Sequence, residues 1–214
     1  MKTITRATAL ALGLALAAAA QHAPAAHDQP ASGNMTMTPH AGGAAISFAE
    51  LKNTVTQLER ARLATAKYQD VRVAQADGYQ PVGPDIPGMG VHFVQTLELE
   101  PKGFDIEKPP ILLYQKTPDA PGGYTLVGVS YLWSAAEGPD GQPLDPPFPK
   151  ALAHWHRHGN ICVLPNIQNP HGLSESQCRE QGGHFVDQSH WLVHVWIWKD
   201  NPAGVFSAEN PALR

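Results

Sequence analysis

The first strongly patterned stretch of the chain lies between residues 47 and 76. A capping box formed by Ser47 and Glu50 marks its start, and Asp77-Gly78 supplies a stop signal. Between them, apolar side chains recur at spacings of three and four, the period of a helix that buries one face: Leu51, Val55, Leu58, Ala61, Ala64, Tyr68 and Val71. We therefore predict one long amphipathic helix over about residues 47–76, packed through that face onto the rest of the domain.

After this helix the pattern changes to short runs rich in β-branched and aromatic residues. Clusters of Pro, Gly and Asp separate the runs, as is typical of strands joined by turns. The runs are VHFVQTLEL, ILLYQK, YTLVGVSYLW, NICVLP and HWLVHVWIWK, whereas GYQPVGPDIPGMG is turn-rich and GPDGQPLDPPFPK is expected to be a long loop. One helix followed by several strands predicts an α+β fold, with the helix packed on an antiparallel β-sheet or a small open barrel.

The first residues of the chain have the pattern of a secretory signal peptide. MKTITR supplies two basic residues, a short run of Ala and Leu follows, and cleavage is expected after Ala20 or, alternatively, between Ala23 and Ala26. The run is too short for the roughly 20 residues of a spanning helix, and no later run is apolar enough. We predict a signal peptide at residues 1–20, no membrane span, and a periplasmic or secreted mature protein.

Residues 21–46 form a segment of low complexity that we predict to be a disordered leader. It carries imidazole and thioether groups that suit copper, particularly Cu(I): His22, His27, Met35, Met37 and His40. A linker that contains these residues by chance explains them equally well. The remaining residues, 47–214, are expected to form a single α+β domain.

Composition narrows the class of function. The chain has 214 residues, 43% hydrophobic and 16% charged, which suits one well-buried domain. The net charge is -4 and the basic residues are scattered, so nothing indicates a nucleic-acid partner. We find no nucleophile elbow, phosphate-binding loop or catalytic-cysteine signature, which makes a metal-independent enzyme the least favoured class.

The chain has two cysteines, Cys162 and Cys178. In an oxidising compartment such an isolated pair is most often a disulfide. It would close a loop of about 16 residues and stabilise the fold by roughly 3 kcal/mol. Ligation of a metal by the two thiolates is the alternative.

Histidines are the strongest indication of a functional site. The chain has 11 histidines, and ALAHWHRHGNICVLP contains three of them at alternate positions. On a strand, residues two apart share a face and lie about 6.5–7 Å apart, so one ion could bind His154 with His156, or His156 with His158, but generally not all three. On a helix the pair would be His154 and His158. Pro149 and Gly159 bracket the segment, which favours an extended or turn-like conformation.

The second candidate region is the apolar run HWLVHVWIWK, which contains His190 and His194. If this run is a strand, His194 shares a face with Leu192 and Trp196, while the opposite face is also apolar. We therefore expect a central strand with a buried His194. A core histidine bonded to the backbone is the alternative to a ligand.

His92 in GMGVHFV is a third candidate, because it lies at the beginning of a predicted strand. Gly88 and Gly90 before it allow unusual backbone angles. A surface position without chemistry is the alternative. Glu98 and Glu100 share its alternation, so either could add a carboxylate. Two further histidines in turn-rich sequence are less favoured, His171 and His184.

At these residues the chain resembles a family of uncharacterised exported bacterial proteins with no secure activity. The resemblance covers about residues 68–212 and rests on GMGVHFV, PPILLYQ, LVGVSYLW, WHRHGNIC, CREQGGHF and VHVWIWKDNPAGVFSAENP. The family motifs are Met-Gly-x-His, Trp-His-x-His-x-x-x-Cys and His-x-Trp, which are specific only in combination. The resemblance implies a shared architecture rather than a reaction.

The same resemblance selects among the candidates. It implies that Cys162 pairs with Cys178, and it places His154 outside the pattern. It favours four histidines as a site: His92, His156, His158 and His194.

The leading hypothesis is a periplasmic metal-binding protein that uses these four histidines. An all-imidazole set suits copper or zinc, with copper favoured by the leader, whereas a carboxylate would favour iron or zinc. Three ligands with an open position would permit a metalloenzyme, and four would indicate structural, storage or transfer use. The alternative is a metal-free module that binds a small apolar molecule on a sheet lined by Trp and His.

Overall fold

The computed structural model describes residues 45–95, 103–164 and 173–213. The predicted signal peptide, the Met and His residues of the leader, and three candidate site residues lie outside these ranges: Glu98, Glu100 and His171. Within the ranges, no helix combines the length and the apolar character needed to cross a membrane.

The N-terminal part of the described chain is helical, but it is divided into three segments: α1 (Phe48–Thr65), η1 (Ala66–Gln69) and α2 (Val71–Ala76). The predicted capping box is present, with the Ser47 side chain accepting from the Glu50 N–H. The single helix predicted over residues 47–76 is wrong, because Asp70 adopts an extended conformation and caps α2 by accepting from the Arg72 N–H at 3.0 Å. Asp is favoured at such N-caps and disfavoured inside helices.

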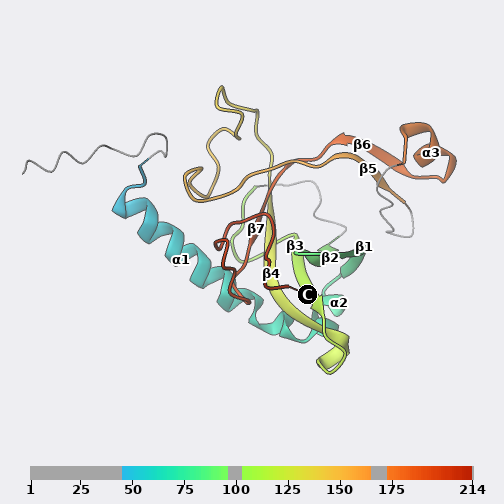
Figure 1. Cartoon of the computed structure of the whole chain (residues 1–214), viewed down its shortest axis with the longest axis horizontal. Coiled ribbons are helices and arrows are strands. Elements are labelled where there is room, and N and C mark those ends of the chain that lie inside the picture. Colours follow the sequence, from blue (N-terminus) through green and yellow to red (C-terminus); the bar gives the residue numbers. More distant parts are fainter. Residues whose placement is uncertain (1–44, 96–102, 165–172, 214) are drawn as a thin grey trace, which may run out of the picture. The chain divides into compact units, whose positions relative to one another are not determined.

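In the described part of the chain, seven strands follow and pair in two antiparallel sheets (Figure 1). The larger sheet has the order β1-β2-β3-β4-β7, with the strands β1 (Tyr79–Ile86), β2 (Gly90–Gln95), β3 (Ile111–Lys116), β4 (Tyr124–Trp133) and β7 (Trp191–Val195). The smaller sheet pairs two strands and lies beside a short helix: β5 (Gly159–Val163), β6 (His184–Gln188) and α3 (Glu175–Glu180). A short 3₁₀ turn, η2 (Pro121–Gly123), precedes β4. The predicted α+β class with an antiparallel sheet is confirmed.

Two strands lie in sequence that was not expected to form strands. β1 occupies part of the segment predicted to be turns, and it contains Pro81 and Pro84. Proline cannot donate to a strand ladder, so a strand of this composition is tolerated at the edge of a sheet, where β1 lies. β6 is short and partly polar, so its sequence lacks the run of β-branched and aromatic residues that predicted the other strands apart from β1.

The five-stranded sheet buries both faces. One face packs with residues of the helices in a cluster that includes Ala61, Val71, Phe93, Val129 and Val193. The other face carries a smaller apolar cluster: Val94, Ile111, Leu113, Val127, Leu132, Leu192, Trp196 and Leu213. The sheet therefore separates a helix-covered face from a second face, and the second face holds the candidate site.

The placement of β7 corrects one expectation. β7 is the last strand in the sheet order rather than a central strand. His156 covers its outer edge by an isolated antiparallel bridge to Leu192, with N···O distances of 3.0 and 2.8 Å. His194 is nevertheless fully buried, as expected, and lies on the same face as Leu192 and Trp196.

Candidate metal centre

Four histidines from three separate parts of the chain lie together in the structure. The ring centroids of His92 and His194 are 5.4 Å apart, those of His194 and His156 are 5.3 Å apart, and those of His156 and His158 are 5.2 Å apart. These residues, which we call the histidine cluster, are the four that the resemblance to exported bacterial proteins favours. They form a continuous series of ring contacts.

The sheet must curl to bring His92 and His194 together. They lie on β2 and β7, which are separated by β3 and β4. In a flat sheet such strands would be about 14 Å apart. The two Nε2 atoms are instead 3.4 Å apart, so the curl and the reach of both side chains close this distance.

His194 is held in one tautomer by the backbone. Its Nδ1 lies 2.6 Å from the carbonyl oxygen of Ala208, which can only accept, so the hydrogen is on Nδ1. The neutral ring then carries a bare lone pair on Nε2, facing His92. Burial is the largest cause that lowers the pKa of His194, to about 3, and the neighbouring His92 lowers it further.

His156 has the same arrangement. Its Nδ1 lies 3.2 Å from the carbonyl oxygen of His154, which again places the hydrogen on Nδ1. Its Nε2 is buried and has no hydrogen-bond partner in the described structure. Burial lowers the pKa of His156 to about 4, so this ring is also neutral at pH 7.

Ser130 is a residue of this region that the sequence reasoning missed. It pairs with His194 across β4 and β7, so the two side chains share a face. Ser130 is fully buried, and its Oγ has no hydrogen-bond partner among the described residues. A single serine within the apolar run LVGVSYLW is the signal that could have identified it.

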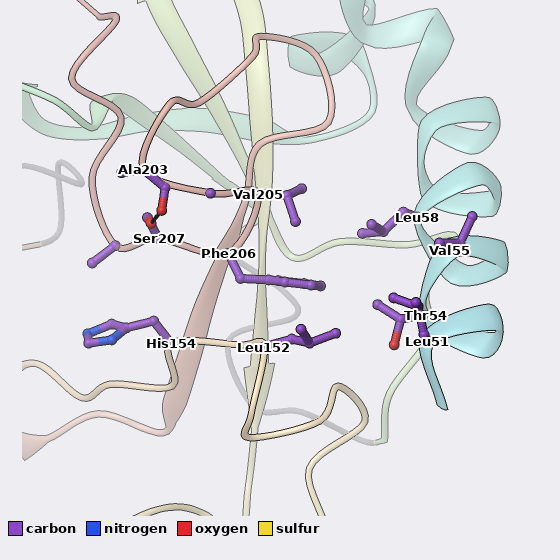
Figure 2. A pocket seen from close by; sticks show the side chains of 12 residues that line it. Leu51, Thr54, Val55, Leu58, Leu152, His154, Ala203, Val205, Phe206 and Ser207 are labelled. Carbon is purple, nitrogen blue, oxygen red and sulfur yellow. Dashed lines mark hydrogen bonds between the residues drawn. The ribbon is translucent and has the colours of Figure 1, made fainter. Parts of the chain in front are cut away.

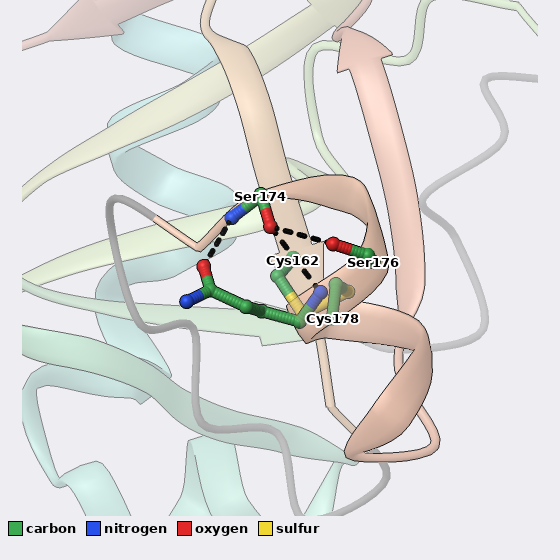
Figure 3. The surroundings of a disulfide bond; sticks show 5 residues. Cys162, Ser174, Ser176 and Cys178 are labelled. Atoms are coloured by element: carbon green, nitrogen blue, oxygen red, sulfur yellow. Dashed lines mark hydrogen bonds between the residues drawn. A yellow bond between two sulfur atoms is a disulfide. The ribbon is translucent and has the colours of Figure 1, made fainter.

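The other candidate residues have different roles. His154 is exposed and contributes its carbonyl to His156, while its ring centroid lies 5.5 Å from that of His156. His184 is exposed at the start of β6. Cys162 and Cys178 form a disulfide beside the capping box of α3, in which Ser174 accepts from the Gln177 N–H (Figure 3). The predicted disulfide is confirmed, and the alternative of thiolate ligation is wrong.

The histidine cluster does not have the arrangement of a preformed metal site. In the described ranges, no group of three or more His, Cys, Asp or Glu side chains is arranged so that it could hold a metal. One pair nevertheless has a suitable spacing. Two ligand atoms of a tetrahedral ion with bonds of 2.0–2.1 Å lie about 3.3–3.4 Å apart, which matches the 3.4 Å between Nε2 of His92 and Nε2 of His194.

A cavity of about 440 Å³ lies apart from this pair, between α1 and two later segments (Figure 2). Its lining contains no tryptophan: Leu51, Thr54, Val55, Leu58, Leu152, His154, Ala203, Gly204, Val205, Phe206, Ser207 and Ala208. It therefore differs from the ligand surface expected on a sheet lined by Trp and His.

No protein-family model, curated protein or solved structure matches the chain. The resemblance to exported bacterial proteins accordingly stays a prediction. The chemistry of the histidine cluster is therefore the basis for assigning a function to this protein.

Proposed function

We propose that the protein binds a transition-metal ion through Nε2 of His92, His156 and His194, with His158 as a further ligand. One observation carries the proposal: His156 and His194 each have Nδ1 fixed on a backbone carbonyl, which leaves Nε2 of the neutral ring unprotonated. Histidines that ligate metals usually donate their other ring N–H to a carbonyl or carboxylate, because this fixes the tautomer and the ring orientation.

The electrostatics of the cluster support the same function. Metal ligation requires neutral imidazole, and the lowered pKa values of His156 and His194 keep both rings neutral well below pH 7. The buried Nε2 of His156 has no hydrogen-bond partner among the residues that the structure describes, which costs on the order of 1–3 kcal/mol. Rotation of the ring toward an ion shared with His92 and His194 would remove that cost.

The ligand set determines which ions are expected. Imidazole suits copper and zinc, and for a given set of nitrogen ligands Cu(II) binds more tightly than Zn(II). We expect this order here, which agrees with the copper-binding character predicted for the leader. If His158 does not ligate, the fourth position would be open to water. The Oγ of Ser130, which has no hydrogen-bond partner within the described ranges, lies on the same face of the sheet as His194 and could bond that water.

A second function is favoured by the contact between His92 and His194. Because Nε2 of His194 is an acceptor, the 3.4 Å separation also fits a long N–H···N hydrogen bond donated by His92. In that case the cluster is a metal-free polar group that positions a bound molecule. Metal analysis separates the two functions.

The test is elemental analysis of the protein purified without a histidine tag and then offered copper, zinc and iron. We expect about one equivalent of bound metal, with Cu(II) binding more tightly than Zn(II). Less than about a tenth of an equivalent would refute the proposal and favour the metal-free function.

Alanine variants identify the ligands. His156→Ala and His194→Ala should each lower the metal affinity at least 100-fold, because each removes a ligand. His154→Ala is the matched control, because alanine keeps the backbone carbonyl that accepts from His156 and removes only an exposed ring, whose centroid lies 5.5 Å from that of His156. A loss of affinity in His154→Ala as large as in His156→Ala would refute this choice of ligands.

A further inference from the structure

The apolar stripe of α1 is buried over only part of its length. Ala61 is fully buried, as predicted, but Leu51 and Val55 are 43% and 47% exposed. The predicted burial of the whole stripe is therefore wrong for its first two turns. These turns instead form one wall of the cavity, opposite Phe206 and Leu152, whose side chains point toward them (Figure 2).

The lining defines the chemistry of an occupant. None of the lining residues is Asp, Glu, Lys or Arg, and the imidazole of His154 is the one ionisable side chain among them, so the lining favours an uncharged occupant. The hydroxyls of Thr54 and Ser207 donate to the carbonyls of Glu50 and Ala203, which leaves their oxygens as acceptors only. The volume, about 440 Å³, falls within the range of small-molecule sites.

We infer that this cavity binds an uncharged small molecule with an apolar body and a hydrogen-bond donor. The apolar part packs between the first turns of α1 and the segment that contains Val205 and Phe206. The donor bonds the oxygen of Ser207, which is partly exposed, whereas Thr54 is only 2% exposed.

The walls of the cavity also carry the carbonyls that orient the histidine cluster. Ala208 accepts from Nδ1 of His194, and His154 accepts from Nδ1 of His156. The segment that contains Val205 and Phe206 is also bonded to the end of β7, because Nε1 of Trp196, the residue after β7, donates to the carbonyl of Ser207 at 2.7 Å. A molecule that packs against this wall therefore holds in place two groups that fix the tautomers of the ligands. This linkage rests on the proposed metal site, whereas binding in the cavity does not.

The probe for the cavity is N-phenyl-1-naphthylamine, an uncharged apolar fluorophore with one N–H donor. Titration of the metal-free protein should give saturable binding of one molecule per chain. Val55→Glu places a charge in the cavity wall and should weaken binding at least tenfold. Leu63→Glu is the matched control, because Leu63 lies on the same helix, is 78% exposed and does not line the cavity.

The inference would be overturned by the absence of saturable binding, by equal loss of binding in both variants, or by equally tight binding of the anionic analogue anilinonaphthalene sulfonate. A dimer that Val55→Glu dissociates would also overturn it, because the cavity wall would then be an interface between copies. If Val55→Glu fails to give the circular dichroism of the native protein, Leu51→Gln replaces it, since Leu51 is also half-exposed.

The linkage is tested by titrating Zn(II) with and without saturating probe. We expect the probe to raise the zinc affinity about three- to tenfold, with the reciprocal increase in probe affinity. Unchanged affinity would refute the linkage. Absence of zinc binding with normal probe binding would refute the metal site and leave the cavity site supported, so the two failures are distinguishable.

Discussion

β6 and β7 follow one another in the chain but belong to different sheets, and their histidines lie in opposite environments. His194 on β7 is fully buried in the five-stranded sheet, whereas His184 on β6 is exposed in the two-stranded sheet. The first sheet is stabilised by apolar packing on both faces, and the second by the disulfide between Cys162 and Cys178. Burial removes water from the imidazole of His194, and the bond from its Nδ1 to the Ala208 carbonyl fixes its tautomer, so chemistry is expected in the first sheet and not in the second.

The largest expected effect is a loss of stability in acid, caused by His194 in the five-stranded sheet and by His156 beside it. The pKa values of His156 and His194 are lowered by folding, so between about pH 6.5 and pH 4 the unfolded chain binds protons that the native protein does not. The free energy of unfolding of the metal-free protein is therefore highest above pH 6.5. It should fall by about 4 kcal/mol in total between pH 7 and pH 5.

Urea unfolding at the two pH values measures this effect. His194→Gln should show about half of the pH dependence, because it removes one of the two imidazoles whose pKa is lowered in the folded protein. His184→Gln should behave as the wild type does. An equal pH dependence in the wild type and His194→Gln would contradict the account.

The next effect is confined to the two-stranded sheet. Replacing both Cys162 and Cys178 by alanine should destabilise β5, α3 and β6 by about 3 kcal/mol, because the unfolded loop gains conformational freedom. Hydrogen exchange should become faster in β5 and β6 and stay slow in β3. Equal acceleration in β3 and β5 would show that the two sheets do not differ in this way.

The smallest effect concerns the residue that connects the sheets. The Arg157 guanidinium lies 4.0 Å from the Trp191 ring centroid, and it donates to Gln188 Oε1 on β6 and to the Ala135 carbonyl. Arg157→Lys loses the planar contact and one of the two hydrogen bonds, and should lower the free energy of unfolding by about 1 kcal/mol.

Arg179→Lys is the matched control for that substitution, because Arg179 is exposed and forms an ion pair with Glu175 within α3. It should change the free energy of unfolding by less than about 0.5 kcal/mol. Equal effects of the two substitutions, measured by urea unfolding, would argue against a connecting role for Arg157.

Local signals in the sequence were sufficient for part of the fold. The capping box at Ser47, the strands β3 and β4 and the face of His194 follow from spacing and residue type alone. Long-range pairing explains what was missed. The edge position that tolerates proline in β1 and the curl that joins His92 to His194 depend on strands far apart in the chain.

The cavity shows the same limit at a finer scale. The spacing of Leu51 and Val55 predicts a buried stripe, but burial requires a partner surface, and the segment around Phe206 stands off from these residues to leave the cavity. A periodic pattern identifies which face of a helix is apolar. It does not determine what covers that face.

The central claim is that the unprotonated Nε2 atoms of His156 and His194 bind a metal ion. Long-range ¹H–¹⁵N correlation spectra of the imidazole rings test it directly, before and after addition of one equivalent of zinc. We predict that both rings are protonated at Nδ1 in the metal-free protein and that zinc shifts both Nε2 resonances while the Nδ1 protons remain. Protonation at Nε2, or Nε2 resonances that zinc leaves unchanged, would contradict the account.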